Sequence, residues 1–279
     1  MKFPIKMKRD RGKIPGFGIS LGLSLSYISF LILIPISSLV LYAAKIPLKE
    51  YFEIILDERV IAAFKISFFS ATTAALINFI FGFIIAWILA RHNFFGKKIV
   101  DACIDLPFAI PTAVAGISLA QVFSPNGFLG KFLAQFNISL GFSTAGIVIA
   151  LVFIGLPFVV RTVQPVIEEF DSVVEEAAAS LGANYFQIFF KVIFPSVLPA
   201  LITGTAMAFA RGLGEYGSVI FISSNMPYVS EIVPLLIIKK LMQFDYVSAS
   251  AIGVTMLMIA FIMLLVINFL QNKMSKERS

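Results

Sequence analysis

The chain of 279 residues is 59% hydrophobic and 14% charged, and it carries a formal net charge of +6 at pH 7. A soluble domain contains about 45–50% apolar and about 25% charged residues, so this composition excludes an ordinary soluble protein. A single cysteine and a single histidine exclude an internal disulfide framework, a multi-thiolate metal site and a histidine-ligated metal centre. We therefore expect a membrane protein with no cofactor and no metal site.

Six apolar stretches are candidates for membrane-spanning helices, because a helix needs about 20 apolar residues to cross a bilayer. They cover residues 17–44, 64–90, 106–123, 144–163, 197–222 and 248–270. The first exceeds the core of a cleavable signal peptide, which has about 7–15 residues, so we expect it to be retained. The predicted fold is all-α: one polytopic transmembrane helical bundle of about six helices over residues 17–272. A basic tail at 1–16 and a short tail at 273–279 flank it.

The third stretch is interrupted by Pro107 and Pro111. Proline is tolerated in a membrane helix where neighbouring groups satisfy the freed backbone carbonyls. We expect a kink or a bend that lines a pathway, and in either case a helix packed inside the bundle.

Lysine and arginine are distributed unequally between alternate connections. Of the 22, 14 lie in the two tails and the second and fourth connections, and 7 lie in the other three. The remaining one, Arg211, lies within the fifth stretch. Because cytoplasmic segments are enriched in these residues, we expect both termini in the cytoplasm. The basic charge then reflects the membrane topology and contact with anionic lipids, with no nucleic-acid partner.

The connection at 168–195 differs from the others because it predicts a short helix of its own. Ser172, followed three residues later by Glu175, is typical of a capping box, and Gly182 fits a left-handed stop. Pro195 is expected at the start of the fifth span. An amphipathic helix lying on lipid is the alternative, but five acidic residues within residues 168–176 disfavour an anionic membrane surface. Docking onto a soluble partner explains this helix better.

The same connection resembles the EAA signature of ABC importer permeases. That signature is Glu-Ala-Ala, three residues, Gly, nine residues and Ile-x-Leu-Pro. The spacing from Glu176 to Pro195 matches it in full, although Val192 and Phe194 replace the preferred Ile and Leu. The resemblance implies a coupling helix that fits a cleft of a separate ATPase subunit. It assigns this role to Glu175, Glu176, Ala177, Ala178, Gly182 and Pro195.

Further segments resemble the oxyanion permeases within that group, namely residues 105–116, 157–165 and 210–217. The basic head and residues 244–246 resemble the T-type subunits of sulfate/thiosulfate importers. A molybdate or tungstate permease of the same architecture remains the alternative. The resemblance implies a type I ABC importer fold and three protein partners: ATP-binding cassette ATPase subunits, a homologous second permease and an extracytoplasmic sulfate-binding protein. It also implies a bacterial plasma membrane, with a plastid membrane as a second possibility.

Two sets of polar residues lie within the expected spans. Arg211 is placed about midway along the fifth, and Glu215 lies four residues on, hence on the same helix face. They either neutralise each other or supply positive potential to the path of an anion. Hydroxyl and amide groups of the third span could bind an oxyanion or join helices; these candidates are Thr112, Ser118 and Gln121.

The sequence has no Gly-x-x-x-x-Gly-Lys-Ser/Thr motif, so we expect no P-loop ATPase site and no enzyme activity in this chain itself. Two other classes of protein fit the sequence less well than a transport subunit does. A membrane enzyme would need carboxylates clustered for a metal at the membrane face, whereas the acids here cluster in the helical connection at 168–195. A stand-alone channel would leave the EAA-like signature unexplained.

Overall fold

The computed structural model describes the backbone of residues 17–276, the side chains of residues 17–267 and that of Phe269. The predicted basic tail at 1–16 lies outside the described residues, as do residues 277–279. Most of the described chain lies in long helices or in consecutive helices that together make one long segment: α1 (Phe17–Ile28), the π-helical turn η1 (Ser29–Leu33) and α2 (Ile34–Ala43); α4 (Glu58–Arg91); α5 (Lys97–Ala109) and α6 (Thr112–Phe123); α8 (Thr144–Glu168); α10 (Tyr185–Ile188), the π-helical turn η2 (Phe189–Ile193) and α11 (Phe194–Leu213); and α14 (Tyr246–Lys276).

Short helices occupy the connections between these segments. They are α3 (Leu48–Ile55), α7 (Phe128–Ala134), α9 (Ser172–Ser180), α12 (Val219–Ile222) and α13 (Val233–Met242). Within the described chain, 5 segments are long and apolar enough to cross a membrane, and the bent pair α5–α6 brings the number to 6. The predicted number of spans therefore agrees with the structure.

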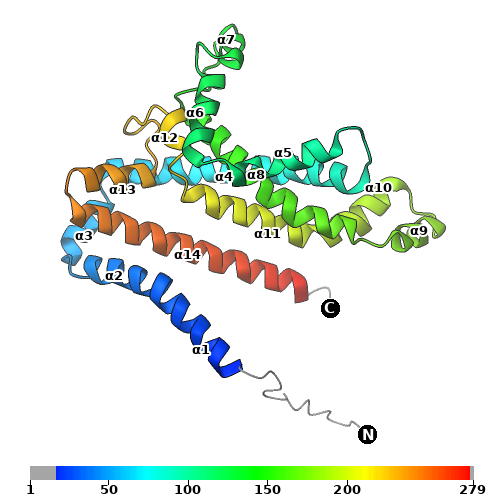
Figure 1. Ribbon diagram of the computed structural model, residues 1–279, viewed down its shortest axis with the longest axis horizontal. Coiled ribbons are helices and arrows are strands. Elements are labelled where there is room, and N and C mark those ends of the chain that lie inside the picture. Colours follow the sequence, from blue (N-terminus) through cyan, green and yellow to red (C-terminus); the bar gives the residue numbers. More distant parts are fainter. Residues whose placement is uncertain (1–16, 277–279) are drawn as a thin grey trace.

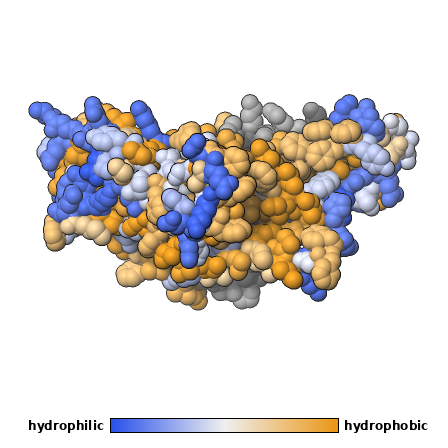
Figure 2. Space-filling model, turned by 90° about the horizontal axis from the view of Figure 1, so that it is seen from above, coloured by the Kyte–Doolittle hydropathy of each residue, from blue (hydrophilic) through white to orange (hydrophobic). Residues whose placement is uncertain are grey.

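The long helices run between two ends of an elongated molecule (Figure 1). At one end lie α9 and the α4–α5 connection, and the start of α1 and the end of α14 point toward this end but stop short of it. At the other end lie α3, α12 and α13. Figure 2 shows that hydrophilic residues gather at these two ends, and that the mainly apolar surface between them is interrupted by one hydrophilic patch near the middle of this face. This distribution is the one that a bilayer requires, because its interior offers no water to polar groups.

The core is formed by α4, α8 and α11, which pack along much of their length. Their contact faces are rich in small residues, which let membrane helices approach closely. Gly82 of α4 faces Val159 of α8 so closely that an added Cβ would lie 2.7 Å from Val159 Cγ1. Gly204 of α11 meets the backbone of the same residue, where an added Cβ would lie 2.9 Å from its Cα. The segment formed by α1, η1 and α2 does not belong to this core, since Ala43 is its only buried residue.

The third predicted span is broken rather than kinked. The helix direction changes by 116° between α5 and α6, and Ile110 between them is extended, with φ −91° and ψ 133°. Proline disfavours the helical conformation of the residue before it, so Pro111 ends α5 at this point. α6 then leads away from the bundle toward α7 (Figure 1). The expectation that this whole segment packs inside the bundle holds only in part for α6: Ala115 and Gly116 are buried, whereas Val114 and Ile117 are each 49% exposed.

The fifth span is also displaced from its predicted position. A continuous helix runs over Tyr185–Leu213, whereas residues 197–222 were expected. Pro195 lies in the first turn of α11, directly after η2, and so lies inside the span and not at its start. The helix stops at Gly214, and α12 is a separate short helix. Arg211 is therefore in the last turn of α11 and not midway along it.

Candidate functional site

The helix α9 is defined by its own sequence at both ends. The side chain of Asp171 caps its start by accepting a 2.9 Å hydrogen bond from the backbone N–H of Val173. The predicted capping residue, Ser172, is instead the first helical residue. Gly182 follows the helix with φ +85°, the left-handed conformation that was expected of it.

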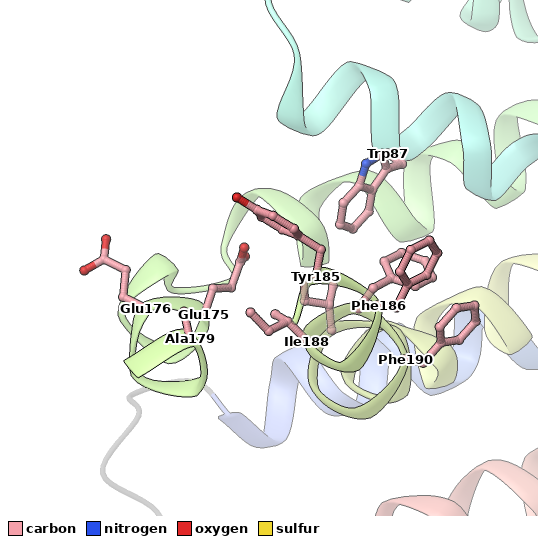
Figure 3. Close-up of a pocket in the computed structure, with 10 residues that line it drawn as sticks. Trp87, Glu175, Glu176, Ala179, Tyr185, Phe186, Ile188 and Phe190 are labelled. Atoms are coloured by element: carbon pink, nitrogen blue, oxygen red, sulfur yellow. The ribbon is translucent and has the colours of Figure 1, made fainter. Parts of the chain in front are cut away.

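The faces of α9 differ in what they touch. None of its nine residues is buried. Glu175 and Ala178 are half-buried and face the rest of the chain, and Ala178 packs against the apolar core near Phe170. Glu176 and Ala177 are exposed, and Figure 3 shows Glu176 pointing away on the opposite side of α9 from the bundle. The predicted coupling residues therefore divide into an inner and an outer set.

The inner carboxylate of Glu175 binds the last residue of α4. Its Oε1 lies 2.5 Å from Nη2 of Arg91, and the two side chains are 28% and 24% exposed. The same guanidinium lies over the ring of Trp87, 5.4 Å from its centroid, and 6.0 Å from that of Phe170. The end of α4 and the start of α9 are thereby joined by one arginine. No local sequence pattern indicates this pair, because its members are 84 positions apart.

An open groove of about 610 Å³ lies between α9, α10 and the end of α4 (Figure 3). The chain enters α10 through a capping box that the sequence reading missed: Asn184 accepts from the N–H of Gln187, whose side chain accepts from the N–H of Asn184. The walls of the groove are mainly aromatic and aliphatic, with two carboxylates at one side. They are Trp87, Glu175, Glu176, Ala179, Tyr185, Phe186, Ile188, Phe189, Phe190 and Ile193.

The second predicted set lies toward the other end of the molecule. Nη1 of Arg211 is 2.6 Å from Oε2 of Glu215, whose side chain is only 2% exposed, whereas that of Arg211 is 36% exposed. Oε1 of Glu215 also accepts hydrogen bonds from the N–H and the hydroxyl of Ser218, at 2.9 and 3.0 Å. The two predicted residues therefore do pair. Their pairing also fixes the turn by which the chain leaves α11.

Of the remaining three candidates, all on α6, only one lies near the Arg211–Glu215 pair. Thr112 lies against Gly217, where an added Cβ would meet its Oγ1 at 2.2 Å, so it adjoins the segment that carries Glu215. Ser118 and Gln121 are exposed on the part of α6 that leaves the bundle. One candidate of α6 thus belongs to the Arg211 cluster, and the other two do not.

An ion cluster around the buried carboxylate of Glu231, at the same end of the molecule as Arg211, was not predicted from the sequence. Glu231 is 0% exposed and accepts from Nε and Nη2 of Arg59 at 2.7 and 2.8 Å, and from Nζ of Lys239 at 2.6 Å. Burial raises the pKa of Glu231, but its hydrogen bonds and attraction to the two cations outweigh this and hold the pKa below its ordinary value. No local pattern identifies this cluster, because Arg59 and Glu231 are 172 positions apart.

Comparison with known proteins places this geometry in a family. Residues 78–276 match the binding-protein-dependent transport system inner membrane components. The sulfate transport system permease protein CysT of Escherichia coli (strain K12) is 46% identical over 268 residues, covering 96% of this chain and 97% of that protein. The protein of the same name from a Synechocystis species is 45% identical over 245 residues, covering 88% and 86%.

Solved structures agree on the fold. A chain of the bacterial alginate ABC transporter, in complex with its alginate pentasaccharide-bound periplasmic protein, superposes with a TM-score of 0.77 at 16% identity, covering 93% of this chain and 94% of that one. A chain of the inward-facing MetNI methionine ABC transporter gives 0.56 at 14% identity, covering 78% and 99%. The predicted all-α permease fold is thereby confirmed. The chain is a multi-pass membrane protein that belongs to the family of binding-protein-dependent transport system inner membrane components.

Proposed function

We propose that this chain is the membrane-spanning subunit of an importer of sulfate and thiosulfate that uses ATP hydrolysed by a separate subunit. The observation that carries the proposal is the 46% identity with the Escherichia coli sulfate permease, over 96% of this chain. The absence of a P-loop motif from the sequence supports a separate ATPase. The chain itself then performs no chemistry.

The outer face of α9 is the part of the chain that docks onto the ATPase. Ala177 is small and exposed beside the outward carboxylate of Glu176, so a partner surface can approach the helix closely. Glu175 and Ala178 face inward and hold α9 on the bundle. Gly182 sets the direction in which the chain leaves α9. In this proposal residues 168–195 form the coupling loop of a single membrane domain, and Pro195 acts within the span that follows.

The partners and the orientation follow from the same proposal. The end that carries α9 faces the cytoplasm of a bacterium whose plasma membrane holds the protein. Both termini lie there, as the excess of Lys and Arg in these segments supports. A homologous second permease completes the pathway, and an extracytoplasmic sulfate-binding protein delivers the anion to the end that carries α12 and α13. Membrane lipids surround the mainly apolar surface between the two ends.

Arg211 is our candidate for contact with the anion. Its guanidinium is partly exposed while it binds the buried Glu215, so it combines a fixed position with an accessible positive charge. Thr112 adjoins this group through Gly217 and can donate a hydroxyl. Glu215 positions the arginine. Ser118 and Gln121 lie farther along α6, where they would meet the anion only on the face turned to the second permease.

Uptake of radiolabelled sulfate tests the proposal. A strain that lacks the chain should lose sulfate uptake and regain it when the gene is restored, and the purified chain should co-isolate with an ATPase. Competition with unlabelled thiosulfate and molybdate decides between the oxyanions. Undiminished sulfate uptake without the chain, or uptake of molybdate alone, would refute the sulfate assignment.

Labelling of introduced cysteines tests the orientation separately. An impermeant reagent added outside should reach positions beside Lys131 and Lys240, and should not reach positions beside Lys97 or Glu176. The natural Cys103 must first be replaced by serine, because it is exposed. Labelling beside Glu176 from outside would refute the assignment of α9 to the cytoplasm.

A further inference from the structure

The coupling helix has little apolar attachment to the rest of the chain. None of the nine residues of α9 is buried, and a loop borders each end of it. Of its residues, Ala178 packs against the apolar core and Glu175 makes an ion pair across to α4. A single methyl group cannot fix the orientation of a helix that a partner pushes. Within the described residues, the contact between Glu175 and Arg91 is the one ion pair that joins α9 to another helix.

The surroundings of Arg91 suit a rigid contact. Its guanidinium binds Glu175 while it lies over Trp87, which is one turn earlier on α4, and near Phe170, which immediately precedes the α9 cap. Its Nε is buried and makes no hydrogen bond within the described residues. A planar guanidinium can stack on aromatic rings while it binds a carboxylate, whereas an ammonium group cannot stack in this way. One side chain thus holds three elements in a fixed relation.

The helix α4 can carry a displacement to the other end of the molecule. It has 34 residues, and at about 1.5 Å per residue it is about 50 Å long. Arg59, the second residue of α4, binds Glu231 through two nitrogen atoms, and Glu231 is fully buried. Arginine–glutamate pairs therefore fasten both ends of α4 to segments that do not cross the membrane.

We propose that Arg91 is a positioning residue that fastens the coupling helix α9 to α4, so that movement of α9 by the ATPase is transmitted along α4. This inference rests on the proposed function. It differs from a role in docking, because Arg91 and Glu175 lie on the inner side of α9 and need not touch the ATPase. Loss of the pair separates hydrolysis from transport while leaving the docking face in place.

The test measures sulfate uptake and ATP hydrolysis by the complete transporter in proteoliposomes. Arg91→Gln and Glu175→Gln should still bind the ATPase, but uptake per ATP hydrolysed should fall about 2- to 30-fold, which corresponds to a loss of about 0.5–2 kcal/mol of coupling free energy. The charge exchange Arg91→Glu with Glu175→Arg should recover much of this loss. Lys98→Gln serves as the control, because it removes an exposed positive charge of the same region and should keep the wild-type ratio.

Arg91→Lys keeps the test decisive if the neutral variants accumulate poorly. It retains the charge but loses the stacking, so its uptake per ATP should lie between those of the wild type and Arg91→Gln. A wild-type ratio in Arg91→Lys and in whichever neutral variant accumulates would overturn the inference, as would a charge exchange that recovers nothing. Failure of the wild-type transporter to take up sulfate would instead refute the proposed function.

Discussion

The two ends of α4 are each held by an arginine–glutamate pair, but the pairs are built differently. Glu231 is 0% exposed and accepts three hydrogen bonds, from Arg59 and Lys239. Glu175 is 28% exposed and receives one, from Arg91. A buried carboxylate requires this number of partners because water cannot replace any of them. The carboxylate at the end with α12 and α13 is therefore buried and held by two cations, whereas the carboxylate at the end with α9 is partly exposed and held by Arg91 alone.

The largest expected effect comes from removing the charge of the buried cluster. Glu231→Gln weakens three charge-assisted hydrogen bonds, each of which contributes about 1.5–3 kcal/mol, and it leaves the partly exposed cations Arg59 and Lys239 close together with no carboxylate between them. The thermal unfolding temperature of the purified protein in detergent should fall markedly. The matched change at the other end, Glu175→Gln, should lower it far less. Equal losses in the two variants would remove the contrast between the ends.

Arg211→Ala should have the next largest effect. It leaves the carboxylate of Glu215 buried with only the partners from Ser218, and an incompletely satisfied buried group costs about 1–3 kcal/mol. The amount of protein in the membrane should fall, and Arg211→Ala with Glu215→Ala should restore part of it. A loss of sulfate uptake at normal abundance would instead favour direct contact between Arg211 and the anion.

Acid should weaken the buried cluster selectively. The pKa of Glu231 is held below its ordinary value of 4.5 in the folded protein. Its contribution to stability is therefore fully present above 4.5 and is lost as the pH falls through the lower, folded pKa. The difference in unfolding temperature between wild type and Glu231→Gln should be constant from pH 7 to pH 5 and shrink at lower pH. A difference that persists unchanged at the lowest pH would show that the carboxylate charge does not stabilise this end.

Gly182→Ala should have the smallest effect on stability and a larger one on coupling. An added Cβ meets no atom within 4 Å, so the cost is only the left-handed backbone, about 1–2 kcal/mol. The protein should accumulate normally, but α9 should be tilted and ATPase co-isolation reduced. Gly214→Ala is the control, since its Cβ also meets nothing within 4 Å and its φ is −88°. Equal amounts of co-isolated ATPase in the two variants would show that docking does not depend on the orientation of α9.

The sequence predicted those features that depend on neighbouring residues. The spans follow from apolar length, α9 from its acidic start and Gly182, and the interruption of the third span from Pro107 and Pro111. The extent of the fifth span was wrong, because a π-helical turn carries the helix through residues 189–193 and the Glu215–Ser218 turn ends it early. Apolar composition alone distinguishes neither feature from a continuous span.

The ion pairs could not be predicted in the same way. Arg59 was counted among the basic residues of one connection and Arg91 among those of another, since nothing nearby in the sequence reveals their partners. The pairing depends on how the helices are arranged around α4. This arrangement brings together side chains that are separated by 84 positions in one pair and by 172 positions in the other. The pair Arg211–Glu215 was accessible because its members are four residues apart on one helix.

The ties at the two ends of α4 also constrain how the chain can change in evolution. Arg59 and Arg91 are 32 positions apart on one helix, so at about 100° per residue they project within about 40° of the same direction. Inserting or deleting a single residue between them would rotate one arginine by about 100° and detach one of the two ends. Differences in length among relatives of this chain should therefore be absent from residues 59–91 and accumulate in the connections that face water.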